Sequence, residues 1–256
     1  MADPRLRDLL DVAMAAAWAG GRRTLAYFNA GVTVDWKADA TPVTAADREA
    51  EGLIRQVIGR AFPEHAILGE EEGESAGSGP VRWIVDPLDG TRSFVRGVPL
   101  YGTLVGVELR GEPVAGVIYL PALDEMLAAA RGEGCTWNGR PCRVSATAAL
   151  ADALVVLSDE RNARTRSDAY VGLAARTQLQ RTWGDCYGYV LVATGRAEVA
   201  LDPVVNVWGC AALLPIVEEA GGRFTDWRGR RTVSGGDAVA TNGTLHAAVL
   251  DLLREP

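Results

Sequence analysis

The residues best suited to chemistry are two aspartates at the end of an apolar stretch. Asp86 and Asp89 follow residues 83–85 (Trp-Ile-Val), and only Pro87 and Leu88 lie between them. Carboxylates this close repel one another unless a cation lies between them, and Mg2+ prefers such oxygen ligands. The pair therefore suggests a divalent-cation site at a strand end. A solvent-exposed turn explains the same spacing equally well, because Asp, Pro and Gly all favour turns.

A second acidic run favours the divalent-cation site over the turn. The apolar residues 66–69 predict a short strand that ends in Glu70-Glu71-Glu72. If this strand neighbours the one before Asp86, Glu70 comes to lie beside Asp86 and Asp89. Three carboxylates and the Leu88 carbonyl would then form an oxygen-only site.

Several motifs together resemble the inositol monophosphatase superfamily of Mg2+-dependent, lithium-sensitive phosphatases. They are G-E-E at 69–71, W-I-V-D-P-L-D-G-T at 83–91, V-W-G-C-A-A at 207–212 and E-E-A-G-G at 218–222. The resemblance extends from the first predicted helix to residues 241–243. Residues 92–99 and 184–187 most resemble the histidinol-phosphate phosphatase branch. The resemblance implies a layered αβαβα sandwich, which combines an α+β half with an α/β half.

The resemblance also implies roles for individual residues. Glu70, Asp86, Asp89 and the Leu88 carbonyl would hold Mg2+, of which the family carries two or three per site. Glu70 and Thr91 would position the attacking water, with Asp47 behind Thr91. Backbone amides of Gly90 and Thr91 would hold the phosphate. By spacing alone, Asp47 belongs to a helix capping box with Thr44, three residues earlier.

One position departs from the family pattern. The family has an aspartate after the tryptophan of the 207–212 motif, where it holds a second metal, and this chain has Gly209. Gly209 cannot supply that ligand, which calls the second metal and full activity into question. The Glu70, Asp86 and Asp89 set is left intact.

Substrate contacts are expected from Arg92, Asp89 and three residues of the second half. Asp202 matches an acidic residue that contacts substrate hydroxyls in the inositol-phosphate branch. Gly184 and Asp185 precede a predicted helix, so Asp185 suits an N-cap as well as a binding site. An anionic pocket of Asp185 and Asp202 would favour an amine-bearing substrate such as L-histidinol phosphate over neutral inositol.

Composition narrows the function classes. The 256 residues carry a net charge of −7, which disfavours nucleic acid as a partner. No stretch approaches the roughly 18 apolar residues that span a bilayer, and no signal peptide is recognised. The four cysteines form no C-x-x-C pair and are expected to be reduced thiols of a cytoplasmic protein. By family resemblance a homodimer is expected.

Two halves are predicted, at 1–147 and 148–256. The first would place two helices against an antiparallel sheet with a turn at residues 138–139, and a polar loop at 37–42 would cover the phosphate as a mobile lid. The second would alternate strands and helices. Its helices are predicted at 167–179, 186–194, 207–220 and 244–253, and its strands at 154–157, 180–183, 199–201, 223–225 and 238–241.

The sequence is compatible with three functions. The first is histidinol-phosphate phosphatase, a hydrolase of histidine biosynthesis that acts by metal-activated water attack. The second is an inositol-1-monophosphatase or a related phosphatase of small phosphate esters. The third is a catalytically crippled family member that binds a phosphorylated ligand, and only Gly209 supports it.

Overall fold

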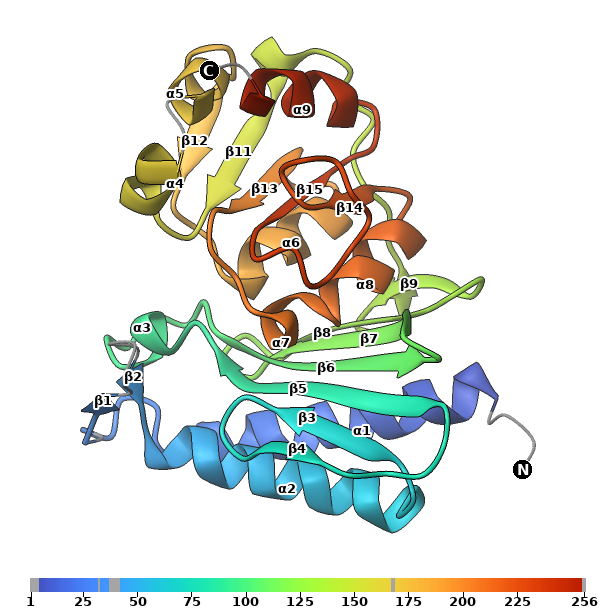
Figure 1. Cartoon of the computed structure of the whole chain (residues 1–256). Coiled ribbons are helices and arrows are strands. Elements are labelled where there is room, and N and C mark those ends of the chain that lie inside the picture. Colours follow the sequence, from blue (N-terminus) through green and yellow to red (C-terminus); the bar gives the residue numbers. More distant parts are fainter. Residues whose placement is uncertain (1–4, 32, 37–41, 167–168, 255–256) are drawn as a thin grey trace.

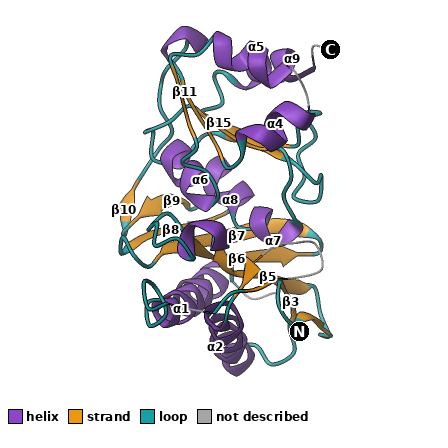
Figure 2. Ribbon diagram, turned by 90° about the vertical axis from the view of Figure 1, so that its left-hand side faces the viewer, coloured by secondary structure: helices purple, strands orange, loops and turns teal. Residues whose placement is uncertain are grey.

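The protein is a stack of five alternating layers of helices and sheets (Figures 1 and 2). A computed structural model describes residues 5–31, 33–36, 42–166 and 169–254, so most of the loop expected at 37–42 lies outside the described residues. The predicted αβαβα sandwich is confirmed. In the described part of the chain, no helix is long and apolar enough to cross a membrane.

The first layer contains helices α1 (Leu6–Thr24) and α2 (Ala45–Ala61), which pack on one face of an eight-stranded sheet. The strand order is β10-β9-β8-β7-β6-β5-β3-β4. The strand bounds are β3 (Ala66–Gly69), β4 (Gly73–Ser75), β5 (Val81–Asp89), β6 (Gly102–Leu109), β7 (Glu112–Leu120), β8 (Glu125–Ala130), β9 (Gly134–Trp137) and β10 (Arg140–Pro141). A separate strand pair, β1 (Asp35–Trp36) and β2 (Pro42–Val43), precedes α2.

Strand β5 is central to the site because it pairs with β3 in parallel and with β6 in antiparallel fashion. The turn expected at Pro87 is wrong: the strand continues to Asp89, and the register shifts between Asp86 and Asp89. Proline lacks the N–H that a regular ladder needs, so the strand bulges there. The chain turns only at Gly90, whose φ of 81° favours glycine, and enters the short helix α3 (Thr91–Phe94).

The second half supplies the other three layers. Helices α6 (Cys186–Ala193), α7 (Val207–Cys210) and α8 (Leu213–Glu219) lie between the two sheets (Figure 1). The five-stranded sheet has the order β12-β11-β13-β15-β14, from β11 (Leu154–Leu157), β12 (Leu179–Arg181), β13 (Val199–Asp202), β14 (Arg223–Thr225) and β15 (Ala238–Thr241). Its outer face carries α4 (Glu160–Arg166), α5 (Ala169–Ala175) and α9 (His246–Arg254). A single 3-10 turn, η1 (Leu150–Asp152), precedes β11.

Two predicted helices in this half are wrong in extent. The helix expected at 167–179 ends at Ala175, and Leu179 already belongs to β12. The helix expected at 207–220 is divided into α7 and α8. Pro215 lies in the first turn of α8, where a missing N–H costs little, but it could not have continued a helix from Val207.

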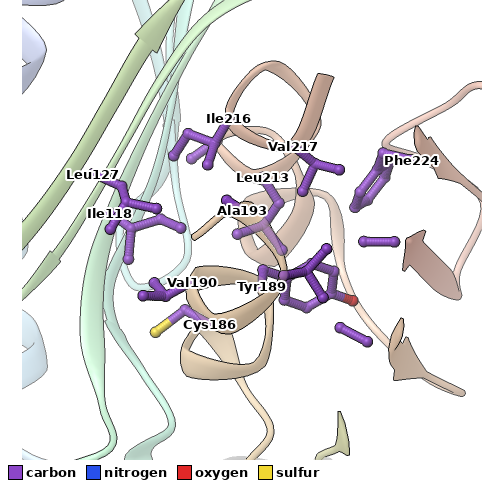
Figure 3. Packing of buried hydrophobic residues seen from close by; sticks show 14 of the residues in the cluster. Ile118, Leu127, Cys186, Tyr189, Val190, Ala193, Leu213, Ile216, Val217 and Phe224 are labelled. Carbon is purple, nitrogen blue, oxygen red and sulfur yellow. The ribbon is translucent and has the colours of Figure 1, made fainter. Parts of the chain in front are cut away.

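Separate apolar clusters fill the spaces between the layers. One joins α1 and α2 to the first sheet, and another lies between the second sheet and its outer helices. The largest lies in the middle, where Ile118 and Leu127 of the first sheet face Val190 of α6 and Ile216 of α8 (Figure 3). Burial of these side chains, at about 25 cal/mol per Å2 of apolar surface, fixes the second half against the strands that carry the carboxylates.

Candidate active site

The three expected metal ligands of the first half gather at the ends of β3 and β5. Gly69 pairs with Val85 in the parallel register, so Glu70 and Asp86 are the next residues on neighbouring strands. Asp86 is buried, and the Leu88 N–H donates to its Oδ1 at 3.1 Å. Burial raises the pKa of Asp86 well above its usual value, and the charges of Glu70 and Asp89 and a hydrogen bond with Glu70 raise it further.

Asp89 lies between this cluster and the second half. Burial raises the pKa of Asp89 to about 6, although hydrogen bonds from Cys186 oppose the rise. The Cys186 N–H, at the start of α6, donates to Asp89 Oδ2 at 2.5 Å. A carboxylate of the first sheet thus satisfies the N-terminus of a helix from the other half.

The glutamate run is held by Glu51, a buried residue of α2 that sequence reasoning missed. The backbone N–H groups of Glu71 and Glu72 donate to its carboxylate at 2.8 and 3.1 Å, and Arg55 pairs with the same group. A side chain at Gly69 would collide with Glu51, since its Cβ would come 2.0 Å from Oε1. The i,i+4 spacing of Glu51 and Arg55 was the available signal.

Asp47 forms the capping box of α2 and also contacts the Thr91 hydroxyl. Its Oδ2 accepts from the N–H and the hydroxyl of Thr44 at 2.8 and 2.7 Å, which confirms the predicted capping box. Its Oδ1 lies 3.5 Å from the Thr91 hydroxyl, which is also 3.0 Å from the Leu88 carbonyl oxygen. Burial raises the pKa of Asp47. The Thr91 hydroxyl is thus held between two acceptors beside the carboxylate cluster.

Asp185 occupies the N-cap position of α6 without capping it. Its backbone has φ 51° and ψ −155°, and its side chain makes no capping hydrogen bond, so the N-cap reading is wrong. The carboxylate turns toward Gly90, where an added Cβ would lie 3.1 Å from Oδ2. Burial raises the pKa of Asp185 well above its usual value, as do the charges of Asp89 and Asp202, whereas Ser93 and Arg92 lower it.

Asp202 is buried at the end of β13. The Ser158 and Tyr189 hydroxyls donate to its two carboxylate oxygens, Tyr189 at 2.7 Å, and sequence reasoning identified neither partner. Gly184 packs against the backbone of Ser158, which a Cβ would approach to 2.2 Å. The close packing at Gly184 ties the segment that carries Asp185 to the end of β11.

Gly209 is buried in α7, which packs against β5 and β6. The charges of Asp202 and Asp89 both act on the thiol of Cys210, whose pKa burial raises well above its usual value. Gly209 is therefore the chain neighbour of a residue on which these carboxylates act. A Cβ added at Gly209 would meet only Val205 Cγ2, at 3.0 Å.

The carboxylate cluster has the chemistry of a hard-cation site. Its members supply only oxygen donors, and each disfavours the charge of the others, a conflict that a divalent cation relieves. In the present arrangement Glu70 and Asp86 share a hydrogen bond instead. No three His, Cys, Asp or Glu side chains among the described residues are arranged as a metal-binding group. A cation between Glu70 and Asp86 would take the place of their hydrogen bond.

Both histidines, His65 and His246, make packing and hydrogen-bond contacts within the fold. His65 stacks on Phe62 with ring centroids 4.6 Å apart and accepts from Trp83 Nε1 at 3.1 Å. His246 is buried between the hydroxyls of Thr225 and Thr241, at 3.1 and 3.0 Å.

The fold and the clustered carboxylates together define a class of protein, and comparison with known proteins agrees. The sequence profile of the inositol monophosphatase family matches residues 5–255. The chain belongs to the inositol monophosphatase family, whose members are metal-dependent phosphatases.

Individual relatives narrow the comparison. The chain is 45% identical to a histidinol-phosphatase of Chlorobaculum parvum over 91% of each chain, and 42% identical to a histidinol-phosphatase of Mycobacterium tuberculosis over 96% of this chain and 98% of the relative. It is 33% identical to an inositol-1-monophosphatase of Rhizobium meliloti over 97% of each. Among solved structures, the extragenic suppressor protein suhB of Bartonella henselae superimposes with a TM-score of 0.90, at 31% identity over 96% of this chain and 98% of that one.

Proposed function

We propose that the chain is a Mg2+-dependent phosphomonoesterase that hydrolyses L-histidinol phosphate to L-histidinol and phosphate, a step of histidine biosynthesis. The observation that carries the proposal is that acidic residues from both halves of the chain come together. Glu70, Asp86 and Asp89 gather on the first sheet, and Asp185 turns toward them from the second half. The first group suits a cation, and the other suits a positively charged substrate.

Glu70, Asp86, Asp89 and the Leu88 carbonyl would hold Mg2+. Bound Mg2+ supplies positive charge that neutralises phosphate oxygens and lowers the pKa of water. The family pattern of two or three ions includes a ligand at position 209, so we infer fewer ions, or a weaker second ion, in this chain. The backbone N–H groups of Gly90 and Thr91 would donate to the phosphate at the turn that follows β5.

Thr91 and Asp47 would orient the attacking water together with Glu70. The Thr91 hydroxyl lies 3.0 Å from the Leu88 carbonyl oxygen and 3.5 Å from Asp47 Oδ1. If it turned from Leu88 to Asp47, it would donate to Asp47 and accept a hydrogen bond from the attacking water. The Asp47 carboxylate is buried, which raises its pKa, and the Thr44 hydroxyl holds it in place. Both side chains are therefore fixed before substrate arrives.

Asp185 would bind the substrate amine. Its backbone conformation is one that residues other than glycine rarely adopt, and such strain is frequent at binding sites. Asp202, held by the Ser158 and Tyr189 hydroxyls, would add a second negative charge near Asp185. Arg92 would act as a countercharge to Asp185, and Gly184 would allow the segment that carries Asp185 to pack closely against Ser158. A neutral polyol would gain less from these acids than an ammonium group.

Phosphate release from L-histidinol phosphate, inositol 1-phosphate and a simple aryl phosphate, each with saturating Mg2+, tests the proposal. We expect the highest kcat/KM with histidinol phosphate. A preference for inositol 1-phosphate would identify the alternative, an inositol-1-monophosphatase. No release from any ester by the parent, together with ligand binding, would identify a crippled family member.

The proposal extends to assembly and location. We infer a homodimer that acts on its small substrate in the cytoplasm, where the four free cysteines would remain reduced by default. We also infer that residues 1–147 and 148–256 are two halves that meet at the substrate cleft. Size-exclusion chromatography with light scattering tests the dimer.

A further inference from the structure

A small hairpin at the edge of the first sheet brings two cysteines together. Strands β9 and β10 pair in antiparallel fashion, and Asn138 and Gly139 form the turn with φ of 47° and 75°. Arg140 lies opposite Trp137 and Pro141 opposite Thr136, so Cys142 follows directly opposite Cys135. The Cys142 N–H donates to the Cys135 carbonyl at 3.0 Å, which fixes this register.

The two sulfur atoms already approach one another. Cys135 and Cys142 are free thiols with Sγ atoms 3.5 Å apart. Directly opposed residues of antiparallel strands have Cα atoms about 4.5–5.5 Å apart, within the range of about 4.4–6.8 Å that a disulfide spans. We propose that Cys135 and Cys142 are an oxidation site that closes to a reversible intramolecular disulfide, separate from the phosphatase site.

The surroundings distinguish the two thiols. The hydrogen bond between the two thiols lowers the pKa of Cys142, burial opposes this, and the charge of Arg196 lowers it further. The same hydrogen bond raises the pKa of Cys135, as does burial. Arg196 is held in place over the Trp137 ring, 4.6 Å from its centroid, and by Thr194 at 2.8 Å. Cys142 is also the more exposed thiol, so it is the attacking group.

The reaction balances with a low-molecular-weight disulfide as oxidant. The Cys142 thiolate attacks one sulfur of the oxidant, the S–S bond of the oxidant breaks, and one thiol leaves after taking up a proton. Cys135 then loses its proton and attacks the Cys142 sulfur of the mixed disulfide, which releases the second thiol. Two protein thiols are oxidised to one disulfide, and one disulfide is reduced to two thiols.

The other cysteines provide an internal control. Cys186 and Cys210 are both buried, and burial raises the pKa of each thiol well above its usual value. Neither should react while the protein is folded. The pair at the hairpin is also easily followed, because trypsin does not cleave between Arg140 and Pro141, so residues 132–143 remain one peptide with both thiols.

Mass spectrometry of the folded, Mg2+-loaded chain treated with oxidised glutathione tests the proposal. We expect the parent to lose the mass of two hydrogens, all of it within peptide 132–143, and to regain it with dithiothreitol. Cys135→Ser should stop at a glutathione adduct on Cys142, Cys142→Ser should stay unmodified, and the control Cys210→Ser should match the parent. Four free thiols after treatment of the parent would overturn the proposal, as would modification at Cys186 or Cys210. Because mass is measured, the outcome is independent of phosphatase activity.

Discussion

Replacement of Gly209 by aspartate should lower the stability of the metal-free protein, and Mg2+ should offset part of that loss. Position 209 is buried, and the charges of Asp202 and Asp89 act on the next residue, Cys210. Two unit charges about 6–8 Å apart interact by about 2–3 kcal/mol at an effective dielectric constant of 20. The new carboxyl can also bind a proton and become neutral, which limits the loss of folding free energy at pH 7 to about 4 kcal/mol. Without metal, Gly209→Asp should therefore lower stability by about 1–4 kcal/mol, or roughly 2–4 °C in Tm per kcal/mol.

Steric effects should be smaller than this charge effect. The new Cβ meets only Val205 Cγ2, at 3.0 Å, and Val205 is a half-buried side chain that can shift by a few tenths of an ångström. Gly209→Asn is the matched control, since it has the same shape and the same contact but no charge. The difference between the two variants isolates the carboxylate.

With Mg2+ the loss of stability in Gly209→Asp should become smaller. A further carboxylate ligand that tightens Mg2+ binding tenfold adds about 1.4 kcal/mol of stability at saturating metal. Thermal unfolding across a Mg2+ titration measures this, and steady-state kinetics should show a higher kcat for Gly209→Asp only, because a second ion stabilises the leaving oxygen. Equal Mg2+ responses and equal kcat in the aspartate and asparagine variants would refute the reasoning.

Three other perturbations test separate parts of the site and the fold. Glu70→Gln should lower kcat by at least a hundredfold with an unchanged circular dichroism spectrum, since a charged oxygen ligand is lost; near-parent turnover would exclude the assignment. Asp185→Asn should lower kcat/KM about tenfold or more for histidinol phosphate, because a charge-assisted hydrogen bond is worth about 1.5–3 kcal/mol, and equal losses with a neutral ester would contradict that role. Burial lowers the pKa of His246 from 6.5 to about 4, so the unfolded chain binds more protons between these values. The stability that neutral His246 contributes is present above pH 6.5 and lost as pH falls toward 4; a His246→Asn variant should lose less stability over that window, as urea unfolding at each pH would measure.

The strands and the acidic cluster were predictable because their signals are local. The apolar runs before Glu70 and Asp86 predicted the two strands, and the parallel pairing of β3 with β5 brings these residues together, although β5 continues to Asp89. The capping box of Thr44 and Asp47 was also readable, because its partners are three residues apart. The break between α7 and α8 was not predicted, although Pro215 is a local signal against one continuous helix.

Long-range partners were not predictable. Asp202 is held by Ser158 and Tyr189, which are 44 and 13 residues away and meet it only when β11, β13 and α6 pack together. Asp185 has the sequence position of a cap, and only the contact of Cys186 N–H with Asp89 shows that the helix end is satisfied from the other half. Such contacts depend on tertiary packing, which single-sequence patterns do not encode.

Mg2+ binding by the parent and by Asp86→Asn, measured by calorimetric titration alongside phosphate release from L-histidinol phosphate, tests the central claim most directly. Asp86 is the buried member of the cluster and contacts Glu70, so removal of its charge should affect every ligand around it. We predict saturable Mg2+ binding and Mg2+-dependent release by the parent, and loss of both in the variant. Release that is independent of Mg2+, or that is unchanged in Asp86→Asn, would contradict the account.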